Sequence, residues 1–153
     1  MSKLAWGKPL LEYATSTDGE PGASASYTKF PTPKKDTTQL NPTDGDETEA
    51  QEEGGDVVDS RNEATKYVLE FECFEKKGET NALTDVNGII AGEFAIRLTP
   101  EDTECAGLQI DRCTIRRTIS YTAADGIMWH YYCKALKPKA GNTVKVQKIG
   151  ASK

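Results

Sequence analysis

The chain has 153 residues, a net charge of −5 and 37% apolar residues. Its length suits one domain that buries its own hydrophobic core. The negative charge argues against a surface that grips nucleic acid through its phosphates, and no apolar run reaches the roughly 18 to 20 residues needed to span a bilayer. The first 13 residues lack the apolar core and cleavage site of a signal peptide, so we expect a protein that stays inside a cell or in a particle assembled there.

The first part of the chain predicts an extended arm followed by a polar loop. Residues 1–13 carry Leu4 and Trp6, and Lys3–Tyr13 is expected to form a short strand or an extended arm. Such a segment is expected to dock on its own domain or on a neighbouring copy. Residues 14–26 are almost all small or polar, which is typical of a loop, and a brief strand is predicted at 27–30.

A second long polar loop is predicted at 41–56, after a short strand at 34–41. It contains no basic residue and seven acids: Asp44, Asp46, Glu47, Glu49, Glu52, Glu53 and Asp56. One interpretation is a solvated loop or hairpin, because like charges repel each other in a helix. The other is a negative surface presented to a partner.

The longest alternating run, Lys66–Gly78, predicts a long β-strand. It places Tyr67, Leu69, Phe71 and Cys73 on one face, and Glu70 and Glu72 on the other. Collecting apolar side chains on one face is the property of a strand, and that face needs a covering layer. Residues 92–98 alternate in the same way and predict a second core strand, with Glu93 on its polar side.

The sequence Thr99-Pro-Glu-Asp102 predicts the start of a short helix. It offers a capping hydroxyl, a proline at the first helical position and carboxylates near the positive end of the helix dipole. Gly107 would end this helix after about two turns.

The rest of the chain predicts further strands. Asp85–Gly88 is expected to form a tight turn. The apolar parity between Leu108 and Tyr121 changes near Asp111, which predicts a bulge or corner. A hairpin turn at 124–126 leads into a strand at 127–136, and a last strand is predicted at 143–149. The chain is therefore expected to be one mainly β domain over residues 1–153, an antiparallel β-sandwich or partly closed barrel with one short helix.

No catalytic or metal-binding signature accompanies this pattern. Four cysteines lack metal-ligand spacing, and His130 is the only histidine. We therefore expect no enzyme, no cofactor and no metal. Trp129, Tyr131 and Tyr132 have two interpretations, a stacking platform for sugars or bases, or core packing.

Charge is divided along the chain between the acidic block and a lysine-rich end. If the fold separates the two, identical copies can attract head to tail, a contact that generates rings and stacks. The alternative is independent, solvated charges. The candidate inter-subunit residues are Leu4, Trp6, Asp46, Glu47, Glu49, Glu52, Glu53, Lys137, Lys139 and Lys145.

The sequence resembles the major tail (tail tube) proteins of long-tailed phages and prophages, especially those of gut Bacteroidetes. The resemblance lies in Gly7-Lys-Pro9, Phe30-Pro-Thr-Pro33 with Asp36-Thr-Thr-Gln-Leu40, Glu49-Ala-Gln-Glu-Glu-Gly-Gly55, Asp85-Val-Asn-Gly88, Arg97-Leu-Thr-Pro-Glu-Asp102 and Ala135-Leu-Lys-Pro138.

The resemblance implies packed β-sheets flanked by one helix, in a virion protein that is assembled in the bacterial host cytoplasm. It implies hexameric rings stacked head to tail into a tube and contacts with other tail proteins. It also implies that DNA passes through the tube without specific binding, and that the protein has no membrane partner. An acidic lumen would repel phosphates, and the candidate lumen-facing residues are Glu70, Glu72 and Glu93. The alternative function is a β-sandwich module that binds a glycan or a protein.

Overall fold

A computed structural model describes residues 3–22, 26–78 and 83–149, in which the regular elements are eleven strands and no helix. Nine strands form one antiparallel sheet: β1 (Leu10–Thr17), β2 (Glu20–Pro21), β3 (Thr28–Lys29), β4 (Gln39–Thr43), β7 (Lys66–Phe74), β8 (Phe94–Thr99), β9 (Gly107–Thr122), β10 (Gly126–Ala135) and β11 (Lys145–Gln147). The other two, β5 (Glu47–Gln51) and β6 (Val57–Asn62), pair with each other.

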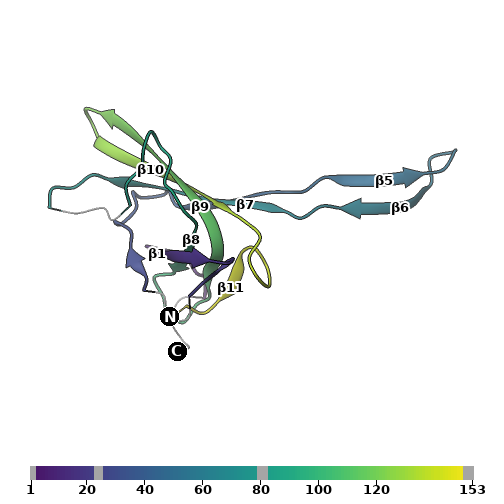
Figure 1. The fold of residues 1–153 in the computed structure, drawn as a ribbon, viewed down its shortest axis with the longest axis horizontal. Coiled ribbons are helices and arrows are strands. Elements are labelled where there is room, and N and C mark those ends of the chain that lie inside the picture. The colour runs from purple at the N-terminus through teal and green to yellow at the C-terminus, as the bar shows by residue number, and fades with distance from the viewer. Residues whose placement is uncertain (1–2, 23–25, 79–82, 150–153) are drawn as a thin grey trace.

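The main sheet runs in the order β2-β1-β8-β9-β10-β7-β4, with β3 added to β1 and β11 added to β9. It curls into a half-barrel, and β5 and β6 project from it as a long hairpin (Figure 1). The expectation of a mainly β, partly closed barrel is confirmed.

The alternation predicted for the long strand is confirmed in β7. Leu69, Phe71 and Cys73 are buried, and the pairing of β7 with β10 sets Phe71 opposite Tyr131. The two rings stack with their centroids 5.0 Å apart and their planes 16° apart. The face they share is the concave side of the sheet, because it holds the hydrophobic core.

Residues 30–33, which follow β3, cross the open side of the half-barrel, and the Phe30 side chain fills it. The Phe30 N–H donates to the Leu11 carbonyl of β1, and Pro33 forms a β-bridge with Cys73 of β7. The Phe30 ring lies 4.7 to 5.2 Å from the rings of Tyr13, Phe71 and Tyr131. This one side chain therefore joins strands from both sides of the sheet.

The predicted change of face near Asp111 is a β-bulge. In the β8–β9 pairing, Phe94 is opposite Cys113 while Ile96 is opposite Ile110. Three steps on β9 thus match two on β8, and the extra residue shifts the side-chain parity. Ile110 and Cys113 are consequently both buried on a strand where strict alternation would expose one of them.

The predicted helix after Thr99 is wrong, because residues 100–106 form turns between β8 and β9. Asp102 accepts the Glu104 N–H on its side chain and the Cys105 N–H on its carbonyl, so the segment closes as a tight turn. The Glu101 carboxylate accepts the Lys8 N–H instead of serving a helix start. A helix is also costly to nucleate in so short a connection.

The loop predicted at 14–26 is partly wrong, since it contains the end of β1 and β2. Of the two forms expected for the acidic stretch, a solvated loop or a hairpin, the structure has the hairpin, formed by β5 and β6. β1 continues through Thr17 because its polar residues find partners: the Ser16 N–H donates to the Glu93 carbonyl and its hydroxyl to the Asp111 carbonyl. β5 forms because β6 supplies a ladder for its backbone. Leu10–Tyr13, expected in the terminal arm, belong to β1, and residues 1–2 and 23–25 lie outside the described residues.

Candidate functional site

The hairpin formed by residues 44–63, which we call the arm, is the most unusual feature of the surface. It continues the β4–β7 pair away from the sheet, and every residue of β5 and β6 is exposed (Figure 1). At its root the Glu63 N–H donates to the Asp46 carbonyl, 2.9 Å away. The arm therefore has a defined start on the body but buries none of its strand residues in this chain.

The root of the arm has no room for a side chain at position 45. A Cβ added to Gly45 would lie 2.2 Å from the Glu63 carbonyl oxygen. The glycine lets the two strands of the hairpin approach each other where they leave the body. This close approach fixes the place where the arm begins.

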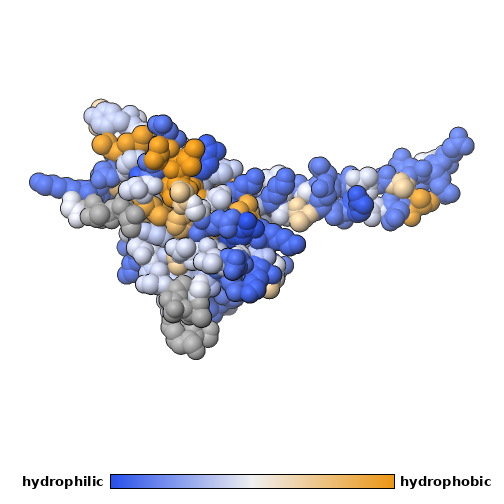
Figure 2. Space-filling model, viewed as in Figure 1, coloured by the Kyte–Doolittle hydropathy of each residue, from blue (hydrophilic) through white to orange (hydrophobic). Residues whose placement is uncertain are grey.

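The tip of the arm combines carboxylates with two valines. Its turn is closed by hydrogen bonds from the Glu52 N–H to the Asp56 carbonyl and from the Gly55 N–H to the Glu52 carbonyl. Val57 and Val58 follow the turn and are 51% and 58% exposed. Figure 2 shows a small apolar spot near the end of a largely hydrophilic arm, and Val57 and Val58 are the large apolar residues exposed in this segment.

The net charge of the arm is more negative than that of the whole chain. Residues 44–63 contain nine carboxylates and one arginine, a net charge of −8, whereas the full chain is at −5. The other residues therefore carry a net charge of +3. Five of the predicted contact residues, Asp46, Glu47, Glu49, Glu52 and Glu53, lie on the arm.

A groove of about 740 Å³ lies beside the N-terminal segment, and we call it the lysine groove. Its apolar lining includes Trp6, Pro9, Pro33 and Leu98. Its charged lining consists of Lys8, Lys34, Lys35 and one carboxylate, Asp36. Trp6 is 69% exposed, so an aromatic face and three cations are open to solvent in one concave surface.

Both walls of the lysine groove are anchored to the body. On one side the Lys8 N–H donates to Glu101 Oε1 over 2.9 Å, and Gly7 fits there because a Cβ would lie 2.6 Å from the same oxygen. On the other side the Lys34 N–H donates to the Glu72 carbonyl. The groove is thus a formed feature of the fold. Leu4, the other apolar candidate of the N-terminal segment, is 61% exposed nearby in the sequence.

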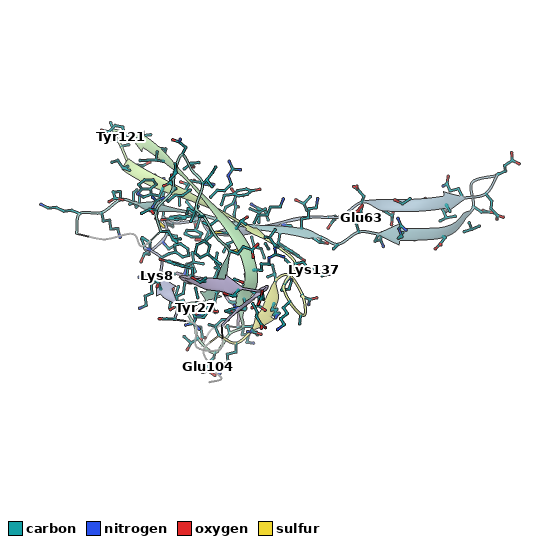
Figure 3. The ribbon with its side chains drawn as sticks, viewed as in Figure 1. Lys8, Tyr27, Glu63, Glu104, Tyr121 and Lys137 are labelled. Carbon is teal, nitrogen blue, oxygen red and sulfur yellow. The ribbon has the colours of Figure 1, made fainter. Side chains whose placement is uncertain are left out.

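Two of the three lysines predicted as contacts near the end of the chain are placed beside acids of their own chain. Lys139 lies 3.2 Å from Glu20, and Lys145 pairs with Asp111. Lys137 offers its carbonyl to Arg112. In Figure 3 Lys137 lies on the side of the body nearer the arm, whereas Lys8 of the lysine groove lies on the other side.

The three predicted lumen-facing glutamates lie in two places. Glu70 and Glu72 are on the outer face of β7 with His130 between them: Nε2 lies 3.2 Å from Glu70 and Nδ1 lies 3.5 Å from Glu72. Glu93 instead receives two hydrogen bonds from Arg112, of 2.8 and 2.9 Å. The Arg112 hydrogen bonds lower the pKa of Glu93, so this carboxylate is held ionised beside a cation.

The aromatic cluster near His130 is mostly engaged within the protein. Tyr131 is fully buried and Tyr132 is half-buried on the opposite face. Trp129 is also half-buried, and its indole N–H donates to Glu75 over 2.6 Å. Core packing is therefore the better description of Tyr131 than a stacking platform.

An ionic cluster that was not predicted from the sequence lies at the end of the core. Arg117 is 7% exposed, its Nε donates to Asp85 over 2.8 Å, and its guanidinium lies 3.9 Å from the Trp129 ring centre. The sequence did contain a sign of this cluster. Arg117 lies between Ile115 and Ile119 at a strand position that the alternation of β9 assigns to the core. A cation at such a position needs a buried partner.

Beyond Arg117, the β9–β10 hairpin exposes apolar side chains. Figure 2 shows an apolar patch over this end of the body, and the exposed residues here are Ile119, Tyr121 and Ile127, together with Val86 and Ile89 of the neighbouring turn. Contiguous apolar surface on a protein is a common mark of an interaction site.

The described residues show neither a metal cluster nor a helix that could cross a membrane. Within 3–22, 26–78 and 83–149, no three His, Cys, Asp or Glu side chains gather closely enough to hold an ion. His130, Glu70 and Glu72 do not converge on one point, because the two nitrogens of His130 face different carboxylates. The same residues contain no helix that is long and apolar enough to cross a bilayer.

Comparison of the sequence with known protein families found no matching family, and comparison with curated proteins found no match.

Proposed function

We propose that this protein is a structural subunit that assembles with copies of itself, and specifically that it forms the tail tube of a phage. The observation that carries the proposal is the arm, a hairpin whose strand residues are all exposed in the single chain. An isolated two-stranded hairpin is marginally stable in water. A neighbouring subunit would provide the contacts that the body of the same chain does not make with these strands.

Charge and apolar surface support the same proposal. An arm at −8 and a body at +3 attract each other between copies but not within one copy, since the arm projects away from its own body (Figure 1). Contacts between two different surfaces of identical subunits generate rings or filaments. The apolar patch at the β9–β10 hairpin adds surface that assembly would bury.

In such a tube DNA would pass along a wall that does not hold it. Glu70 and Glu72 lie side by side on the polar face of β7 and would repel phosphates there. Glu93 contributes less to a repelling wall because Arg112 neutralises it. The partners in this proposal are other copies and other tail proteins, and the location is the virion after assembly in the host cytoplasm.

The alternative, a glycan- or protein-binding β-sandwich module, rested on exposed aromatic side chains. The burial of Tyr131 removes one of them, and Trp129 is half-buried against Arg117. The exposed Trp6 and the half-buried Tyr132 remain to support it.

Sedimentation velocity and negative-stain microscopy of the full chain, across protein and salt concentrations, test the proposal. We expect rings or filaments that grow with protein concentration and shrink with salt, because salt screens the charge attraction. The informative variant replaces residues 46–62 with a short glycine-serine turn. It should keep the fold of the body and lose assembly, whereas a wild-type chain that stays monomeric under every condition would contradict the proposal.

A further inference from the structure

The lysine groove and the arm tip complement each other in both charge and polarity. The groove offers three lysines around Trp6 and two prolines, and the tip offers Glu52, Glu53 and Asp56 followed by two exposed valines. A concave surface lined by lysines and apolar side chains is complementary to an acidic, valine-bearing turn.

We propose that the arm tip of one copy docks in the lysine groove of the next copy. This inference rests on the proposed self-assembly and names the surface that receives the arm. Each strand of the arm is about nine residues from root to tip, or roughly 30 Å at the rise of a β-strand. The tip therefore lies far from its own body and reaches a second molecule.

The positions of the two surfaces make the contact directional. Figure 3 places Lys8 on the side of the body away from the arm, whose root is marked by Glu63. A tip on one side that fits a groove on the other leaves a free tip and a free groove after each addition. Such a heterologous contact closes into a ring or continues as a stack.

Within the groove, Lys35 is the cation best suited to recognise the tip. Lys34 already lies 3.5 Å from Asp125 and 5.9 Å from the centre of the Phe74 ring. Lys35 is exposed, and the next residue, Asp36, has a positive φ of 61° that fixes a sharp bend in the chain. Trp6 would cover the valines of the tip once the charges meet.

A charge-swap experiment on the full chain tests the pairing. Lys35→Glu and Glu53→Lys should each weaken assembly by up to about fivefold, the effect of one exposed ion pair, and the double variant should restore it. Lys134→Glu, which reverses an exposed lysine on β10 outside the groove, is the matched control. Weakening by both single variants without recovery in the double variant would overturn the pairing.

Site-specific crosslinking reads the contact directly. Glu53→Cys and Lys35→Cys chains, both carrying Cys105→Ser, are mixed and treated with a short bis-maleimide, and the expected product is a dimer containing one chain of each kind. Pairing Glu53→Cys with Lys134→Cys is the control. Assembly without this crosslink would overturn the groove assignment and leave the proposed function standing. An absence of both assembly and crosslink would overturn both.

Discussion

Arg117 and Asp85 form an ion pair at the end of the hydrophobic core, with Nη2 and Oδ1 2.6 Å apart and the two side chains only 8% and 16% exposed. Asp85 also accepts the Gly88 N–H, and the Arg117 N–H donates to the Gly88 carbonyl. The pair thus fastens the turn at 85–88 to β9, at the boundary between the core and the exposed end of the β9–β10 hairpin.

Removal of the Asp85 charge should destabilise the whole domain. We expect Asp85→Asn to lower the free energy of unfolding by about 2 kcal/mol, because it leaves the Arg117 cation buried without a carboxylate. Denaturant unfolding followed by tryptophan fluorescence measures the change. The double variant Asp85→Asn/Arg117→Met should recover part of the loss, and an unchanged midpoint for Asp85→Asn would contradict the role of the pair.

The same carboxylate should make stability depend on acid pH. The hydrogen bond from Arg117, with that from the Gly88 N–H, lowers the pKa of Asp85 in the folded state. Since the unfolded chain then binds this proton more readily, the stability it contributes is complete at neutral pH and falls as the pH drops from about 5 through the folded pKa.

We expect Asp85→Asn to flatten this acid-side loss when midpoints are compared across pH. Glu93→Gln provides the second measurement, because the Arg112 hydrogen bonds lower the pKa of Glu93 in the same direction. Its effect on stability at neutral pH should be far smaller, since both partners of that pair are 35% exposed. A wild-type protein with equal stability at pH 3 and pH 7 would argue against both contributions.

A side chain at position 45 should loosen the arm without unfolding the body. Gly45→Val places a Cβ against the Glu63 carbonyl, so the root must open. Hydrogen exchange at Thr48–Arg61 and proteolysis within 46–62 should both become several-fold faster, while the unfolding midpoint of the sheet stays the same. Gly22→Ala, which enters open space, is the control.

The buried thiols should be unreactive in the folded protein. Burial, with the nearby Glu93 charge, raises the pKa of Cys113 to about 12, and burial raises that of Cys133 as well. We expect iodoacetamide at pH 8 to modify Cys105, which is only half-buried, and to reach the other three cysteines after denaturation. Mass spectrometry of tryptic peptides reads each position, and rapid native labelling of Cys113 would contradict its burial.

The sequence by itself determined the long central strands and most of the side chains on their core face. Tyr131, Phe71 and Ile96 are buried where their alternation placed them, and the change of parity at Asp111 located the bulge. Alternation can be read from the sequence, because side chains of a strand point to the same face at every second residue, whichever strand pairs with it.

The tertiary structure alone decided which distant residues meet. At the turn over 100–106, which replaced a predicted helix, Glu101 accepts a hydrogen bond from Lys8, 93 residues earlier. Arg117 could occupy a core position because Asp85 lies beside it. The acidic stretch became an arm because β5 pairs with β6 beyond the ends of β4 and β7. The lysine groove likewise joins residues 5–9 to residues 32–38. These partners are set by the curl of the sheet and by the order of its strands. The local alternation of side chains encodes neither of these two features.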